Sequence, residues 1–154
     1  MMEGKLLVMA VVLLLGGVPL GLGAAEEKPD AAEVKKLEEA MGADLAKAMM
    51  ACADRALEAY NKEDAKAFYA EWAAATKAAQ QEGIFTKSYV EGYKKKFNGA
   101  LKAKKLVADE RARYDKNAGP VLIYEGEFEK RKTKIVLGFM KDGETFKLMQ
   151  VTFD

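Results

Sequence analysis

The feature of this sequence that most restricts its fold is a change in the spacing of its apolar residues along the chain. Between residues 34 and 97 apolar residues recur every three or four positions, as on one face of a helix. From residue 106 onward they alternate with polar residues, as in strands that have one face toward water. Helices followed by consecutive strands predict an α+β domain, with N-terminal helices packed on one face of a four-stranded antiparallel sheet.

Two long helices are predicted first. One begins after Asp30, whose carboxylate suits an N-cap, and Gly42 kinks or splits it at a cost of about 1 kcal/mol relative to alanine. Asp64 then caps a second, alanine-rich helix that runs through about residue 82 and is closed by Gly83.

A third, shorter helix is predicted from a capping box. Ser88 and Glu91 have the spacing of this motif, Thr86 is the alternative cap, and Asn98-Gly99 ends the helix.

The alternation of apolar and polar residues from residue 106 onward predicts strands over residues 106–114, 121–128, 134–140 and 145–153. The Asp142-Gly143 pair is a strong signal for a hairpin between the last two strands.

Residues 1–25 have the pattern of a secretory signal peptide: Lys5, an apolar run over residues 6–15, and small residues up to Ala25. The alternative is a retained anchor, since residues 6–25 are long enough to span a bilayer. The Gly and Pro residues between positions 16 and 23 favour cleavage, because they weaken a spanning helix. We therefore expect a periplasmic or secreted protein cut near Ala25.

The composition excludes several kinds of chemistry. The chain has 25 basic and 24 acidic residues, so no long-range attraction to nucleic acid is expected. Histidine is absent, which removes Ser-His and Cys-His pairs and most zinc or copper sites. Cys52 is the only cysteine and lies on an apolar helix face, so it is expected to be a buried small hydrophobe. Neither a metal site nor a cofactor is predicted.

A family resemblance is carried by residues 53–69, ADRALEAYNKEDAKAFY, by Trp72, and by the closing strands from Tyr124 to Phe153. These segments resemble the nuclear transport factor 2-like superfamily, which has a cystatin-like fold, and are most similar to small exported bacterial families without assigned function. The resemblance covers roughly residues 49–153, which divides the chain into a signal peptide (1–25), a helical extension (26–48) and this domain (49–154).

The resemblance implies a curled sheet closed by helices around a cone-shaped cavity, which members use as an enzyme pocket or merely as core. It also implies a homodimer that pairs across the open sheet face. Catalytic members place an acid/base pair in the cone, but no catalytic residue can be carried over to this chain one by one.

Aromatic residues are the candidates for a ligand pocket, with core packing as their alternative role. They are Tyr60, Phe68, Trp72, Tyr93, Tyr114 and Phe139. Asp54 is a weak catalytic candidate, because a carboxylate buried among such rings could transfer a proton with a tyrosine steadying the oxyanion. Its alternative role is a solvated helix charge.

Two lysine-rich stretches, residues 94–105 and 130–134, could form a basic face for a lipid phosphate or an acidic polymer. The alternative is a solvated surface that blunts strand edges. Apart from that face, membrane contact is expected only through the signal peptide.

Three functions follow from these observations. The first is an exported noncatalytic domain that binds a small apolar ligand or an envelope protein. The others are a purely structural envelope protein and a small acid/base enzyme of the isomerase or dehydratase type.

Overall fold

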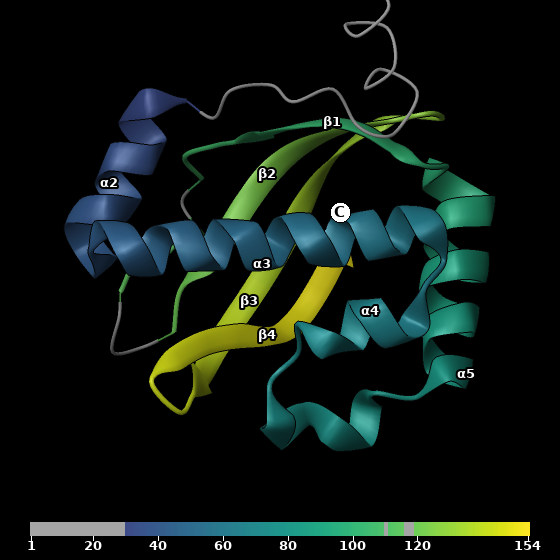
Figure 1. Ribbon diagram of the computed structural model, residues 1–154. Helices are drawn as coiled ribbons and strands as arrows, with labels where there is room; N and C mark the ends of the chain where they lie inside the picture. Colours follow the sequence, from purple (N-terminus) through teal and green to yellow (C-terminus); the bar gives the residue numbers. More distant parts are fainter. Residues whose placement is uncertain (1–29, 110, 116–118) are drawn as a thin grey trace, which may run out of the picture.

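The computed structural model describes residues 30–109, 111–115 and 119–154, so the predicted signal peptide and its cleavage site lie outside the described residues. The architecture is α+β, with the helices before the strands in the chain (Figure 1). The helices are α2 (Ala31–Met41), α3 (Ala43–Lys62), α4 (Ala65–Ala70), the 3-10 helix η2 (Ala74–Ala79), α5 (Glu82–Ile84) and the π-helix η3 (Phe85–Asn98). None of the helices in these ranges is both long enough and apolar enough to cross a membrane.

The strands are β1 (Leu101–Leu106), β2 (Val121–Phe128), β3 (Lys132–Asp142) and β4 (Thr145–Phe153), in the antiparallel order β1-β2-β3-β4. One row of paired, buried residues crosses all four strands: Leu106, Tyr124, Ile135 and Phe153. Helix α3 lies across the sheet (Figure 1). Within the described residues β1 and β4 are not paired with each other, so the sheet is open.

The predicted break at Gly42 is confirmed, and it separates α2 from α3. Gly42 has φ 88°, a value in the range that favours glycine, and its N–H donates to the Glu38 carbonyl at 2.7 Å. The predicted cap at Asp30 is also confirmed, because its carboxylate accepts from Ala32 N at 2.9 Å. Leu37 of α2 is fully buried and α3 runs through residues 48 and 49 without a break, so the helical extension shares the core of the domain.

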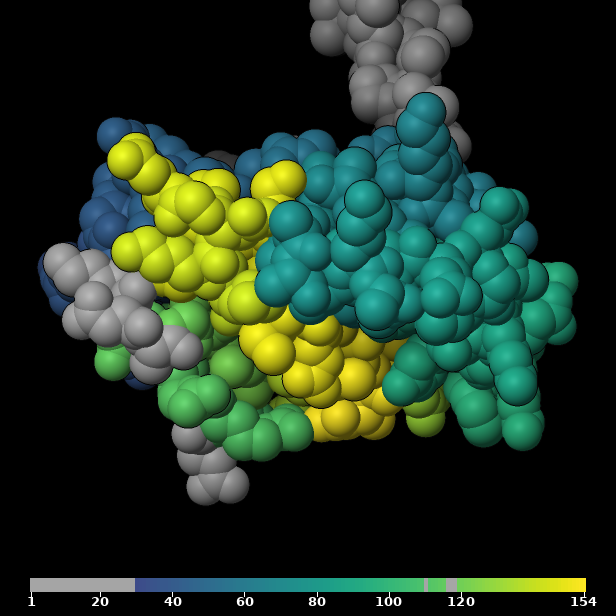
Figure 2. Space-filling model, turned by 90° about the horizontal axis from the view of Figure 1, so that it is seen from below, coloured from purple at the N-terminus to yellow at the C-terminus, as the bar shows by residue number. Residues whose placement is uncertain are grey.

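The prediction of one helix over residues 64–82 is wrong. Asp64 does cap α4, accepting from Ala67 N at 2.9 Å, but the helix ends at Ala70. The chain then runs beside β4, where Leu148 N donates to the Glu71 carbonyl and Ala73 N donates to the Leu148 carbonyl. These bonds to a strand 75 or more residues away outweigh the local helix propensity of the segment. Figure 2 shows the teal part of the chain that includes α4 beside the yellow β4.

The predicted start of the third helix is also wrong. Ser88 and Thr86 lie inside the helix, which begins at Glu82 as α5 and continues as η3. Gly83, expected as a terminator, lies within α5. The predicted end at Asn98-Gly99 is confirmed, and Gly99 N donates to the Lys94 carbonyl at 2.7 Å.

The first strand was predicted too late in the sequence. β1 covers Leu101–Leu106, and the segment predicted as a strand over 106–114 is mostly irregular. Asp109 ends the alternation there by forming a turn, in which its carboxylate accepts from Arg111 N at 3.0 Å and its carbonyl accepts from Ala112 N. The other three strands are confirmed, as is the hairpin turn at Gly143, where φ is 66°.

Candidate functional site

The space between the helices and the sheet holds a cluster of aromatic rings centred on Phe68 of α4. Phe68 is fully buried, and its ring centroid lies 4.7–5.6 Å from those of Tyr69, Trp72, Phe85 and Tyr89. These distances are those of rings in direct contact. In this part of the interior the Phe68 ring therefore packs directly against its four aromatic neighbours.

Four of the six predicted pocket residues belong to this continuous set of rings. Tyr60 and Tyr93 both contact Phe153, at 5.0 and 4.9 Å between centroids. Tyr93 also contacts Tyr89, which joins this pair to Phe68 and Trp72. Their binding of a ligand stays a prediction.

The other two predicted pocket residues lie elsewhere. Phe139 is buried on β3, paired with Leu148 of β4. Tyr114 lies against α2: its hydroxyl and Glu33 Oε2 are 3.2 Å apart, and Lys36 Nζ lies 5.4 Å from the centroid of its ring. Tyr114 therefore ties the loop before β2 to the N-terminal helix.

Three buried polar side-chain atoms in the described part of the chain have no hydrogen-bond partner: Trp72 Nε1, Tyr124 Oη and Asn98 Nδ2. An unpaired buried donor costs roughly 1–3 kcal/mol. Burial also raises the pKa of Tyr124 far above its ordinary value, with a smaller contribution from the negative charge of Asp54. Trp72 and Tyr124 are the positions where the polar atom of an interior ligand or water would find a partner.

Asp54, the weak catalytic candidate, points away from the core. Its side chain is 58% exposed and forms an ion pair with Lys104 Nζ of β1 at 2.6 Å. Lys104 Nζ also lies 5.5 Å from the centroid of the Tyr124 ring. The cation therefore lies close to both the candidate carboxylate and the nearest buried tyrosine.

The thiol of Cys52 is held in an unreactive state. Burial raises its pKa to about 12, assisted by its hydrogen bond to Glu71. Burial alone would raise the pKa of the Glu71 carboxyl, but its hydrogen bonds from Arg55, at 2.7 and 2.9 Å, lower it below the ordinary value. This group of side chains links α3 to the segment that runs beside β4.

Two hollows on the surface of the described residues differ from the predicted pocket. One, of about 720 Å³, lies beside the turn between α3 and α4 and is lined by Lys62, Glu63, Asp64, Ala65, Lys66, Tyr69, Ala70, Gln80 and Glu82. The other, of about 290 Å³, is lined by Val107, Ala108, Glu125, Lys132, Thr133 and Lys134. Neither contains any of the six predicted pocket residues. Both mix acidic and basic side chains, so neither favours one sign of charge.

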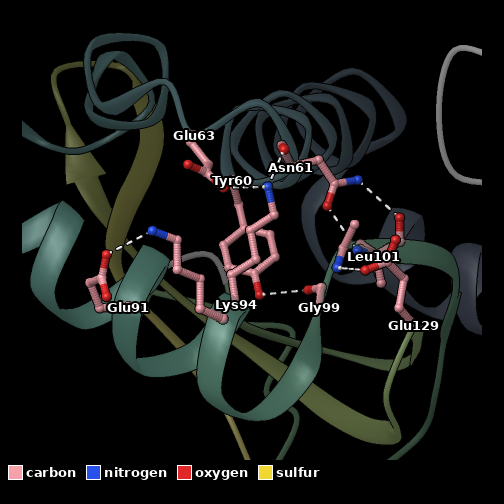
Figure 3. A network of polar contacts seen from close by, with 10 residues as sticks. Tyr60, Asn61, Glu63, Glu91, Lys94, Gly99, Leu101 and Glu129 are labelled. Carbon is pink, nitrogen blue, oxygen red and sulfur yellow. Dashed lines mark hydrogen bonds and ion pairs between the residues drawn. The ribbon is translucent and has the colours of Figure 1, made fainter.

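A polar network joins the end of α3 to the end of η3 and to β1 (Figure 3). The Asn61 side chain donates to the Leu101 carbonyl at 2.9 Å and accepts from Leu101 N at 2.8 Å. The Tyr60 hydroxyl donates to the Gly99 carbonyl at 3.1 Å. Lys94 Nζ donates to the Asn61 carbonyl at 2.6 Å and to Glu63 at 3.0 Å. The Asn61 to Asp64 segment, which carried part of the family resemblance, thus serves as a structural junction.

This network brings the two predicted basic stretches together. Lys130 N, in the β2–β3 turn, donates to the Asn98 carbonyl at 2.9 Å, so the turn lies against the end of η3. Five cations of the stretches form ion pairs: Lys94 with Glu63, Lys95 with Glu91, Lys104 with Asp54, Lys132 with Glu127 and Lys134 with Asp109. The basic surface is therefore smaller than the sequence indicated, and the described cations of the stretches that form no ion pair are Lys96, Lys130 and Arg131 near the end of η3 and Lys102 and Lys105 on β1.

The described ranges contain no group of three or more Cys, Asp or Glu side chains that could hold a metal ion. Compared with known proteins, the chain matches no family model, no curated protein and no solved structure. Fold and site together define a class only: an α+β protein with helices on one face of an open four-stranded antiparallel sheet.

Proposed function

We propose that this chain is an exported, noncatalytic interaction domain of the cell envelope that binds its partner through its outer surface. The proposal includes the nuclear transport factor 2-like resemblance and its cystatin-like cone. Support comes from the order of helices before a four-stranded antiparallel sheet and from α3 lying across that sheet. Export, to the periplasm or out of the cell, is supported by the signal-peptide pattern of residues 1–25.

The observation that carries the proposal is the ring packing around Phe68. Four neighbouring rings contact a side chain with no exposed surface. A cone used as a pocket would leave apolar side chains facing unfilled space, whereas a cone used as core fills that space with its own side chains. The packing favours the second use, and a domain with a filled interior binds at its surface.

The acid/base alternative has less support. It requires a buried carboxylate with a raised pKa beside a tyrosine, whereas Asp54 is mostly exposed and paired with Lys104. Among the described residues, the two carboxyl groups with clearly shifted pKa values, Glu71 and Asp109, are both shifted downward by cationic neighbours. A carboxylate held in its charged form is a weak proton acceptor at neutral pH.

Mass spectrometry of the protein released by its host tests the proposal, first under native and then under denaturing conditions. The expected result is a chain that starts at Glu26 and carries no small noncovalent ligand. The native spectrum also reports whether the chain is a homodimer, as the resemblance implies. A chain that keeps its leader contradicts export with cleavage. A small ligand released on denaturation contradicts the filled interior and favours the predicted pocket instead.

A further inference from the structure

One surface of the molecule combines an exposed aromatic ring with unpaired cations. In the part of the chain that the structure describes, three large apolar side chains are exposed: Ile84, Phe97 and Met149. Phe97, the aromatic one of the three, is 46% exposed and has two cations near its ring. Lys96 Nζ lies 5.0 Å and Arg131 Cζ 5.7 Å from the ring centroid. We call Lys96, Phe97, Lys130 and Arg131 the cationic corner.

Hydrogen bonds to Asn98 and to the backbone of η3 hold Arg131 and Lys130 of the cationic corner. Arg131 Nε donates to Asn98 Oδ1 at 2.7 Å, and Asn98 is fully buried. Lys130 N donates to the Asn98 carbonyl and Lys130 Nζ donates to the Lys95 carbonyl. The corner therefore needs little reordering before it meets a partner, which lowers the entropic cost of binding.

The charge of the corner is not neutralised within the described residues. Lys96, Lys130 and Arg131 form no ion pair there, whereas Lys95 is paired with Glu91 at 2.8 Å. Glu129, which precedes Lys130 in the chain, accepts a hydrogen bond from Ala100 N at 3.0 Å. Two cations thus lie at one exposed ring, and Lys130 is held on the same turn as Arg131, an arrangement complementary to a negatively charged partner.

We infer that the cationic corner docks this protein on the surface of an anionic phospholipid membrane. Each Lys or Arg near such a surface contributes a similar electrostatic attraction, and long cationic side chains keep their charge among the headgroups. The Phe97 ring selects a membrane over a soluble polyanion, because a membrane interface also removes apolar surface from water whereas a soluble polyanion offers charge alone. This inference rests on the proposed interaction role and names its partner.

Co-sedimentation with lipid vesicles tests this inference, using the protein as its host releases it and variants prepared the same way. All of them share one N-terminus, so any contribution from the leader is common to all. The wild type is expected to bind phosphatidylcholine vesicles that contain phosphatidylglycerol and to lose this binding in pure phosphatidylcholine or at high salt. Lys96→Gln/Lys130→Gln should weaken binding about 25-fold, from about fivefold for each charge removed. Phe97→Ser should weaken it about tenfold.

Matched controls use residues from the same helical region that lie outside the corner. Ile84→Ser removes a similarly exposed apolar side chain, 40% exposed, and Lys77→Gln/Lys87→Gln removes two exposed charges. Both should bind vesicles within about twofold of the wild type, since neither change alters the corner. Equal losses in controls and corner variants would overturn the inference, as would a wild type that does not bind anionic vesicles at low salt.

A second arm uses soluble polyphosphate in place of vesicles. If Lys96→Gln/Lys130→Gln abolishes vesicle binding while Phe97→Ser has no effect, and polyphosphate competes, the corner binds soluble anions and the membrane inference is wrong. A wild type that ignores vesicles but holds a protein partner in native mass spectra overturns this inference alone. A small ligand held in the interior overturns the proposed surface binding as well.

Discussion

Replacing Phe68 with alanine tests whether the interior of this protein is a packed core or a ligand pocket. Phe68 has no exposed surface and contacts four aromatic rings. Truncation of a buried Phe to Ala costs about 3–5 kcal/mol, through lost burial and the cavity left behind. Aromatic contacts add to the burial term, so the loss should lie in the upper half of that range, at roughly 4–5 kcal/mol.

The matched control is the same chemical change at Phe97, whose side chain is 46% exposed. Its truncation should cost about 1 kcal/mol or less, because little buried surface is lost and no interior cavity forms. Urea denaturation followed by circular dichroism and by the fluorescence of Trp72, the only tryptophan, gives both free energies of unfolding. Since domains of this size are stable by about 5–15 kcal/mol, Phe68→Leu provides a milder variant if Phe68→Ala does not fold.

A loss of less than about 1.5 kcal/mol for Phe68→Ala, or a loss no greater than that for Phe97→Ala, would contradict a packed core. Either result would mean that the rings around Phe68 are loosely packed. The interior would then be the better candidate for the binding site, and the unpaired Trp72 Nε1 would be its natural polar contact.

Three further predictions concern single side chains. Asn61→Ala should lower the free energy of unfolding in urea by about 2 kcal/mol, because two hydrogen bonds to Leu101 are lost. Lys62→Ala, which removes an exposed ion pair with Glu58, should lower it by about 0.5 kcal/mol or less. Equal losses would refute the structural role of the Asn61 amide. The Asp109 carboxyl has a pKa well below its ordinary value because two cationic side chains donate to it, so its stabilisation is complete above the ordinary pKa of about 4 and is lost as the pH falls through the lower folded value. Stability profiles between about pH 2 and 7 should therefore fall more steeply in acid for the wild type than for Asp109→Asn, and parallel profiles would contradict this. Burial raises the pKa of the Cys52 thiol to about 12. At pH 8 the folded protein should therefore react with a thiol reagent about a thousandfold more slowly than the unfolded protein, as measured by absorbance. Similar rates would show that the thiol is accessible.

The parts of the fold that were predicted correctly depend on local chemistry. Asp30 and Asp64 cap helices with their own carboxylates, and Gly42 and Gly99 adopt positive φ values that favour glycine. Each of these signals acts within a few residues of its position. The period of two in the last three strands is local in the same sense, since one face of each strand must meet the helices.

The errors occurred where distant backbone decided the structure. The alanine-rich segment after Ala70 has high helix propensity, yet Glu71 and Ala73 bond to Leu148 of β4. Nothing within the segment signals that pairing. The strand predicted over 106–114 does not form for a related reason, since the Asp109 carboxylate, which makes the turn there, also accepts a hydrogen bond from the distant Lys134 of β3.

The exposure of Phe97 could not be predicted from its spacing, because Tyr89, Tyr93 and Phe97 follow one face of an ordinary α-helix. In η3 the turns are wider, as the hydrogen bond from Gly99 N to the Lys94 carbonyl five residues back shows. The buried positions shift accordingly, so that Asn98 is buried where an α-helical period would bury Phe97. The Phe97 ring, which an α-helical period would place on the same face as Tyr89 and Tyr93, therefore lies at the surface.

The same shift explains why a functional surface can arise without a motif. Asn98, turned inward, holds Arg131 and the β2–β3 turn, and this brings cations from two distant stretches to the ring that η3 turned outward. Composition shows only that lysines are abundant, and it cannot tell which of them are neutralised by partners such as Asp54. Since a net charge of +1 gives no field over the whole molecule, any preference for anions must come from this local grouping. Binding that depends on the cationic corner should therefore weaken about 25-fold with two lysine substitutions there, while the same change in net charge elsewhere leaves it within about twofold.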